Sequence, residues 1–140
     1  MTERIAAKNT VVNERQTILV IDDDPDWTDL LRAYFLDKYH VKVANSAFEA
    51  VKMAQNDRPV LMIIDLIMPG MDGFGVIRRL EDSIQAQIPT ILLTGWKCAE
   101  VEECASAFES VTVMGKPVSL MALDATVSAQ LRKNSEARTS

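Results

Sequence analysis

Five short apolar runs alternate with five segments of helical periodicity along this chain of 140 residues. The runs cover residues 17–21, 41–44, 60–64, 90–93 and 111–114. The first, third and fourth are almost continuously apolar, which is typical of strands covered on both faces of a parallel sheet. Strict alternation with short connections predicts right-handed crossovers and helices on both faces. We therefore predict an α/β fold, a doubly wound parallel sheet of five strands with five helices.

The first and fourth helical segments carry specific expectations. Asp24 is suited to cap the first helix, and Pro25 is suited to open it. The expected buried face of that helix contains Trp27, Leu30, Leu31 and Tyr34. Cys104 falls on the apolar stripe of the fourth helix, so we predict a small buried residue. A disulfide with Cys98 is not expected, because a spacing of six residues puts the two thiols on different sides of a helix.

Composition limits the domain organisation and the function classes. A formal net charge of −5 argues against tight, nonspecific binding of nucleic acid. The chain has no run of about 18 apolar residues, so no membrane span is predicted. Residues 1–15 lack the apolar core of a signal peptide and are interpreted as a disordered leader. One domain is predicted over 16–133, followed by a polar tail at 134–140, too short for a further domain. These lengths fit either a single-domain protein or a piece of a longer one.

Polar side chains follow four of the five apolar runs at their carboxyl ends. Asp22 and Asp23 follow the first run, Asp65 the third, Thr94 the fourth and Lys116 the fifth. Ligands of open α/β sheets bind outside the carboxyl ends of the strands, so we expect these side chains to form one site. Carboxylates crowded at one point attract a hard divalent cation, because their like charges could not otherwise all stay ionised.

The combined pattern resembles the receiver domain of response regulators in two-component signalling. An Asp pair follows the first strand, Asp-x-x-Met-Pro-x-Met-Asp-Gly begins at Asp65, Thr-Gly follows the fourth strand, and Lys-Pro follows the fifth. The resemblance covers residues 17–131. It implies a flavodoxin-like sheet with strand order 2-1-3-4-5. It also implies a cytoplasmic phosphorelay protein that switches protein contacts rather than an enzyme with a separate substrate.

The resemblance assigns the acidic residues their roles. Asp65 is similar to the family's phosphoacceptor, which takes a phosphoryl group from the phosphohistidine of a sensor histidine kinase or a phosphotransfer protein. Mg²⁺ is the implied cofactor. Its implied ligands are Asp23 directly, Asp22 through water, Asp65, and the backbone carbonyl of Ile67.

Four further positions match the family. Thr94 is expected to donate its hydroxyl to the phosphoryl group, and Gly95 to leave room for that group. Lys116 is expected to neutralise charge on the phosphoryl group. The Lys116–Pro117 peptide bond is expected to be cis, as in the family. The resemblance also implies a downstream protein that responds to the signal, and the sequence does not identify it.

Two features depart from the common family pattern. Val113 stands where many receivers carry an aromatic switch residue, so we expect residues 95–99 to move more than Val113 on phosphorylation. Fast family members often carry polar residues two positions after the phosphoacceptor and two after the threonine. Here these positions hold Ile67 and Trp96, and Trp96 is bulky enough to cover the approach of water. The resemblance therefore implies slow loss of the phosphoryl group.

Two other functions remain open from the sequence. Asp24-Pro25-Asp26-Trp27-Thr28 spells D-x-D-x-T, which resembles the nucleophile motif of haloacid-dehalogenase-like phosphatases. Against this enzyme class, the motif begins beyond the predicted strand end and suits an opening helix. The second alternative is a receiver-shaped adaptor that signals without phosphorylation. The presence of every residue needed for phosphorylation argues against it.

Overall fold

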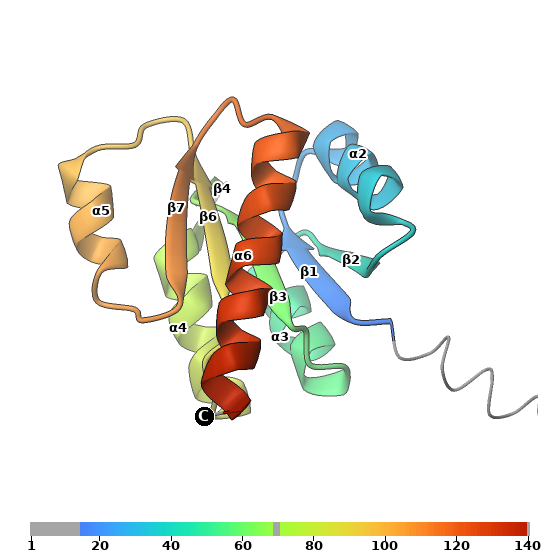
Figure 1. Cartoon of the computed structure of the whole chain (residues 1–140). Helices are drawn as coiled ribbons and strands as arrows, with labels where there is room; N and C mark the ends of the chain where they lie inside the picture. The colour runs from blue at the N-terminus through green and yellow to red at the C-terminus, as the bar shows by residue number, and fades with distance from the viewer. Residues whose placement is uncertain (1–14, 69–70, 140) are drawn as a thin grey trace, which may run out of the picture.

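The computed structural model describes residues 15–68 and 71–139 and is built around one parallel sheet (Figure 1). Its strands are β1 (Thr17–Ile21), β2 (His40–Ala44), β3 (Leu61–Asp65), β6 (Thr90–Thr94) and β7 (Val111–Gly115). They lie in the order β2-β1-β3-β6-β7, which is the predicted order 2-1-3-4-5 when these five strands are counted along the chain. The predicted fold class is confirmed. The predicted leader lies outside the described residues apart from Arg15.

Helices cover both faces of the sheet, as the alternation of the sequence predicts (Figure 1). In the described part of the chain they are α2 (Pro25–Phe35), α3 (Ala47–Asn56), α4 (Gly73–Ile84), α5 (Ala99–Ala105) and α6 (Leu120–Thr139). Side chains alternate along β1: Ile18 and Val20 pack with α2 and α6, whereas Leu19 and Ile21 pack with α3, α4 and α5. This alternation divides the core into two layers, one on each side of the sheet.

A short antiparallel hairpin, not foreseen from the sequence, follows β3. It consists of β4 (Ile67–Met68) and β5 (Met71–Asp72), and α4 begins immediately after it. Asp72 caps α4 by accepting a hydrogen bond from the backbone N–H of Phe74. A Cβ added to Gly73 would lie 3.0 Å from the Leu66 Cα and 3.2 Å from the Asp65 carbonyl oxygen. Glycine therefore allows α4 to begin directly against the end of β3.

The predicted buried face of α2 is partly wrong. Leu31 is buried as expected, but Leu30 and Tyr34 are 47% and 38% exposed. The face that packs on the sheet instead contains Thr28, Leu31 and Phe35. The Tyr34 hydroxyl donates to Asp124 on α6, which explains its position beside that helix. The helix carries apolar residues on more than one side, so periodicity alone did not select the buried side.

The prediction of a buried Cys104 is also wrong, because its side chain is exposed. Helix α5 packs through Val101 and Ala105, and Phe108 packs against the same core layer from the turn that follows the helix. Cys104 precedes Ala105 and lies off this side of the helix. Cys98 occupies the N-cap position of the helix without a side-chain capping hydrogen bond, and both cysteines are free thiols.

The last helix extends beyond the predicted domain boundary. Helix α6 continues through residues 134–139, which the sequence analysis assigned to a polar tail. Among the described residues, no helix combines the length and apolar character needed to cross a membrane.

Candidate functional site

The three predicted carboxylates meet at the carboxyl ends of β1 and β3. Asp22, Asp23 and Asp65 each offer an oxygen atom, and these atoms lie within 4.8 Å of one another. Strands β1 and β3 are parallel neighbours, so both ends reach the same edge of the sheet. The sequence-based expectation that these side chains come together is therefore met in the structure.

Lys116 reaches the same point from the end of β7. Its Nζ lies 3.3 Å from the Asp65 Oδ2, and the Asp65 side chain is only 14% exposed. The backbone N–H of Lys116 donates to the Thr94 carbonyl, which holds the start of the β7–α6 connection against β6. Asp65 thus belongs to the acidic cluster and also pairs with a lysine. Within the cluster, Asp65 is therefore a carboxylate with a partner of opposite charge.

Thr94 is buried at the end of β6, and its hydroxyl is tied to the loop that follows. The backbone N–H of Trp96 donates to the Thr94 Oγ1 over 3.0 Å. This bond occupies the oxygen as an acceptor, so the hydroxyl hydrogen can still donate to another group. Any movement of the Thr94 side chain would therefore act on the backbone of the β6–α5 loop.

Space and backbone geometry next to Thr94 agree with the sequence-based expectations. A Cβ added to Gly95 would meet no atom within 4 Å, so open space lies beside this residue. The Lys116–Pro117 peptide bond is cis, as expected. Val113 is 8% exposed and packs in the core on the side of α3, α4 and α5.

Asp22 is the most enclosed carboxylate of the cluster, with 2% of its surface exposed. Burial raises the pKa of its carboxyl above the usual range, and the nearby Asp65 raises it further. A hydrogen bond from the backbone N–H of Asp24 to the Asp22 Oδ1 acts in the opposite direction. A cation near this carboxylate would favour its charged form, because opposite charges stabilise each other.

The cluster fits a magnesium ion in donor type and in size. All of its side-chain donors are carboxylate oxygens, which suit this hard cation. Ligands on opposite sides of an octahedral Mg²⁺ are about 4.2 Å apart, because each lies about 2.1 Å from the ion. The three oxygen atoms lie within 4.8 Å of one another, which is close enough for one ion to contact them directly or through water. Asp22 is the most deeply buried of the three and is the best candidate for that indirect contact.

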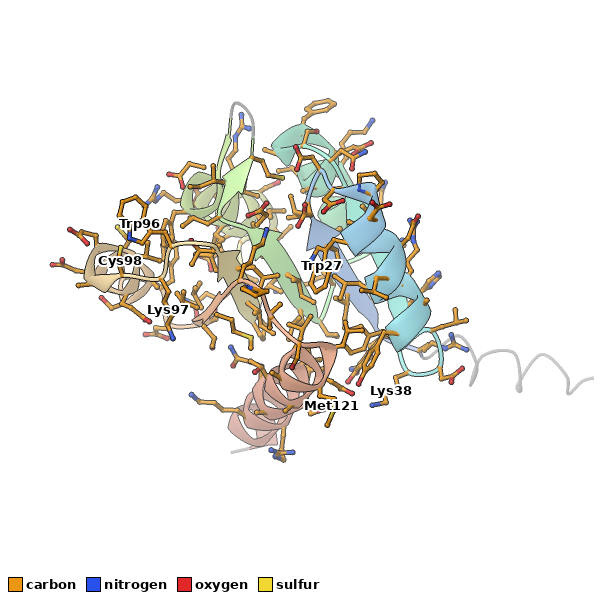
Figure 2. The ribbon with its side chains drawn as sticks, turned by 90° about the horizontal axis from the view of Figure 1, so that it is seen from above. Trp27, Lys38, Trp96, Lys97, Cys98 and Met121 are labelled. Atoms are coloured by element: carbon orange, nitrogen blue, oxygen red, sulfur yellow. The ribbon has the colours of Figure 1, made fainter. Side chains whose placement is uncertain are left out.

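Ile67 and Trp96 are exposed at the rim of the site. Their exposed fractions are 73% and 76%, and the Ile67 N–H contacts the Asp65 Oδ1 over 3.4 Å. Figure 2 shows Trp96 beside α5 with Lys97 and Cys98, whereas Trp27 lies near α2. In this structure the Trp96 indole therefore lies on the α5 side, and it can cover the site only if its loop moves.

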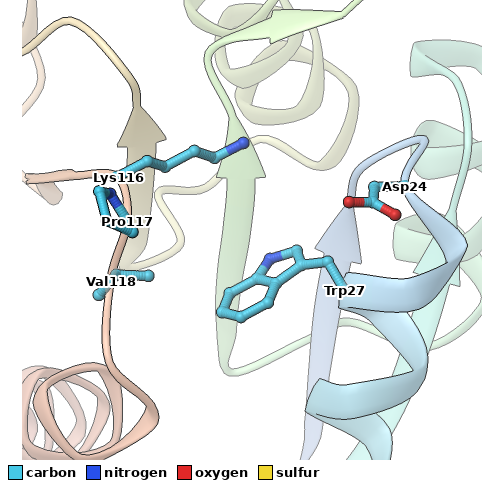
Figure 3. A pocket seen from close by; sticks show the side chains of 5 residues that line it. All are labelled: Asp24, Trp27, Lys116, Pro117 and Val118. Carbon is cyan, nitrogen blue, oxygen red and sulfur yellow. The ribbon is translucent and has the colours of Figure 1, made fainter.

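A second tryptophan lines a cavity next to the site, which the sequence analysis did not predict. Trp27 shares a cavity of about 390 Å³ with Lys116, Asp24, Pro117 and Val118 (Figure 3). The sequence placed Trp27 on the apolar face of its helix, and it does pack against the core. No local pattern indicated that its indole would also border the lysine.

Comparisons with known proteins agree with this geometry. Residues 18–128 match the family described as response regulator receiver domain. Response regulator MprA of Mycobacterium leprae is 32% identical over 117 residues, which are 83% of this chain and 51% of that protein. The chemotaxis protein CheY4 of Vibrio cholerae has a similar structure, with a TM-score of 0.76 and 25% identity. That match covers 82% of this chain and 98% of the chemotaxis protein.

Coverage differs among the relatives. An uncharacterized 14.6 kDa protein of Leptolyngbya boryana is 38% identical over 103 residues, and the match covers 72% of this chain and 79% of that protein. The chain spans about half the length of other curated relatives, such as the transcriptional regulatory protein AfsQ1 of Streptomyces coelicolor, where the match covers 51%.

Proposed function

The chain belongs to the response regulator receiver domain family, whose members act in phosphorelay signalling, and from this premise we propose that Asp65 carries the phosphoryl group. The observation that supports this choice most directly is the position of Asp65. It ends the central strand β3, belongs to the acidic cluster and pairs with Lys116. The positive charge of Lys116 would offset the repulsion between the Asp65 carboxylate and the anionic phosphoryl group that it attacks.

The proposed reaction transfers a phosphoryl group from a histidine to Asp65. A carboxylate oxygen of Asp65 forms a bond to phosphorus while the bond from phosphorus to the histidine nitrogen breaks. The electron pair of the broken bond stays on the imidazole, which then takes up a proton. Lys116 neutralises charge on the phosphoryl oxygens, and the Thr94 hydroxyl donates a hydrogen bond to one of them.

Magnesium is the proposed cofactor of this step. Asp23, Asp22, Asp65 and the backbone carbonyl of Ile67 would hold the ion. When bound, the ion supplies charge neutralisation and orientation of the phosphoryl oxygens.

The proposal implies particular partners. A sensor histidine kinase or a phosphotransfer protein would donate the phosphoryl group, in the cytoplasm. The proposed output surface is formed by α5, β7 and α6, and a downstream protein would bind there. Neither nucleic acid nor a membrane is a proposed partner of this chain.

Mass spectrometry with a small phosphodonor tests the proposal without requiring the natural kinase. The full chain incubated with acetyl phosphate and Mg²⁺ should gain the mass of one phosphoryl group, and chelation of the metal should prevent the gain. A chain that stays unmodified under these conditions would instead support the adaptor function. Steady hydrolysis of a generic phosphatase substrate would support the enzyme alternative. The structure does not favour that enzyme, because Asp24 caps α2 and Asp26 lies in its first turn.

Phosphorylation is proposed to move the β6–α5 loop. Because the Trp96 N–H is bonded to the Thr94 hydroxyl oxygen, a shift of Thr94 towards the phosphoryl group would pull residues 95–99 with it. Val113 is small and buried, so it has no large ring to turn into the vacated space. We expect residues 95–99 to move further than Val113 when structures with and without beryllofluoride are superposed. A large shift of Val113 with a static loop would contradict this proposal.

The lifetime of the phosphoryl group is proposed to be long. Ile67 has no side-chain hydrogen-bonding group to orient an attacking water, and the indole of Trp96 cannot accept a proton. We expect the double variant Ile67→Asn, Trp96→Glu to lose phosphate roughly tenfold faster, equivalent to about 1.4 kcal/mol in the barrier. The rate can be measured by following the decay of the phosphorylated mass.

A matched control for this measurement is Met121→Glu, since Met121 is also strongly exposed but lies on α6. This variant should lose phosphate at the wild-type rate. If the double variant also decays at that rate, Ile67 and Trp96 do not set the lifetime.

A further inference from the structure

The Trp27 indole carries a hydrogen-bond donor that has no partner within the described structure. Its Nε1 atom is buried and makes no hydrogen bond. An indole N–H can only donate, and a buried donor without an acceptor destabilises a protein. The Trp27 side chain is partly buried and packs against the core layer of α2 and α6, as Val118 and Leu120 also do. The ring is therefore anchored by apolar contacts that do not involve its nitrogen.

The cavity that Trp27 lines extends to Lys116, which is the partner of Asp65 in the proposed phosphorylation site. Lys116 lines the same cavity, and its Nζ is 3.3 Å from the Asp65 Oδ2. In Figure 3 the indole lies between α2 and Val118, with its nitrogen edge turned towards the end of the Lys116 side chain. The ammonium group of Lys116 and the unpartnered N–H of Trp27 thus belong to two residues that line one cavity. Both groups favour an anionic oxygen over an apolar occupant.

The other charged group of the cavity does not satisfy the indole. Asp24 also lines the space, but its Oδ1 accepts a hydrogen bond from the Asp26 N–H as the cap of α2. Asp24 is exposed, and its carboxylate serves the first turn of the helix. In the resting protein the indole N–H is shielded from solvent and has no acceptor. A phosphoryl oxygen is a charged acceptor, and hydrogen bonds to charged groups are about twice as strong as neutral ones.

We propose that Trp27 is a further residue of the phosphoryl site, whose Nε1–H donates to an oxygen of the group bound at Asp65. This inference rests on the proposed function of Asp65. Trp27 would stabilise the phosphorylated state together with Lys116 and Thr94, from the side of the site formed by α2. The indole would also limit the approach of water from that side, because its ring lies between α2 and Val118 at the edge of the cavity.

Beryllofluoride binding tests this contact, since the complex mimics an aspartyl phosphate without a leaving group. The chain of 140 residues is titrated with beryllofluoride and Mg²⁺, and the bound form is followed by fluorine NMR. Trp27→Phe keeps an aromatic ring but removes the N–H, so beryllofluoride should bind about tenfold more weakly. The matched control is Tyr34→Phe, which also keeps an aromatic ring of α2 and removes only its donor, but that donor bonds Asp124 on α6. Because Tyr34 lies outside the site, this variant should bind within about twofold of wild type.

The indole proton provides a second measurement that does not depend on the folding of Trp27→Phe. In Trp96→Phe the only indole signal belongs to Trp27. On addition of beryllofluoride this signal should move downfield and exchange more slowly with solvent.

The possible results separate the inference from the proposed function. Equal affinity of wild type and Trp27→Phe, or an unchanged Trp27 signal at saturation, would overturn the role of Trp27 alone. A wild-type protein that binds no beryllofluoride would overturn the proposed function of Asp65 as well.

Discussion

Asp65→Asn is expected to gain no phosphoryl mass from acetyl phosphate and Mg²⁺, whereas the wild-type chain gains one phosphoryl group. The amide has nearly the same shape as the carboxylate but is not a nucleophile towards phosphorus under these conditions. The substitution also removes the negative charge that pairs with Lys116 at 3.3 Å. The effect should therefore be a complete loss rather than a reduced rate. Intact-mass spectrometry over a time course measures it directly.

A matched control separates loss of the nucleophile from a general effect of removing an aspartate. Asp72 caps α4, and asparagine caps helices about as well as aspartate. Asp72→Asn should therefore remain folded and gain the same mass as wild type. Phosphorylation of Asp65→Asn at the wild-type rate would show that another residue is the acceptor.

Asp23→Ala is expected to abolish measurable binding of Mg²⁺. Asp23 is the exposed member of the acidic cluster, so it can contact a hydrated ion at the least cost in desolvation. Without it, Asp22 and Asp65 remain, and Asp65 is already paired with Lys116. Isothermal titration calorimetry of the wild type and the variant measures the difference.

The control for this titration is Asp26→Ala, which removes one exposed negative charge from the first turn of α2. It changes the net charge of the chain equally but lies outside the cluster, so binding should persist. An unchanged Mg²⁺ titration in Asp23→Ala would refute the ligand role of Asp23.

The sequence predicted the sheet and the meeting of the polar residues for a simple physical reason. Parallel strands buried on both faces must be continuously apolar, so β1, β3 and β6 stand out from the helices between them. Once the strands are parallel, residues that follow their carboxyl ends share one edge of the sheet. Asp22, Asp65 and Lys116 could therefore be placed together before any coordinates were known.

Other features depended on tertiary packing that local patterns do not encode. Helix α2 has apolar side chains on two sides. Its packing on the sheet buries Phe35, whereas Tyr34 stays exposed and its hydroxyl bonds Asp124 on α6. The β4–β5 hairpin pairs only two residues from each strand, too few to produce a recognisable alternation. Trp27 was assigned to the core, yet it also lines a cavity that the β7–α6 connection helps to form.

The central claim, that Asp65 accepts the phosphoryl group, is tested most directly by locating the modified residue. Borohydride reduces an aspartyl phosphate to an alcohol, which leaves homoserine at the position that carried the phosphoryl group. The wild-type chain is phosphorylated with acetyl phosphate and Mg²⁺, reduced, digested and sequenced by tandem mass spectrometry. We predict homoserine at position 65 and unmodified aspartate at 22 and 23. Homoserine at another position, with intact aspartate at 65, would contradict the account.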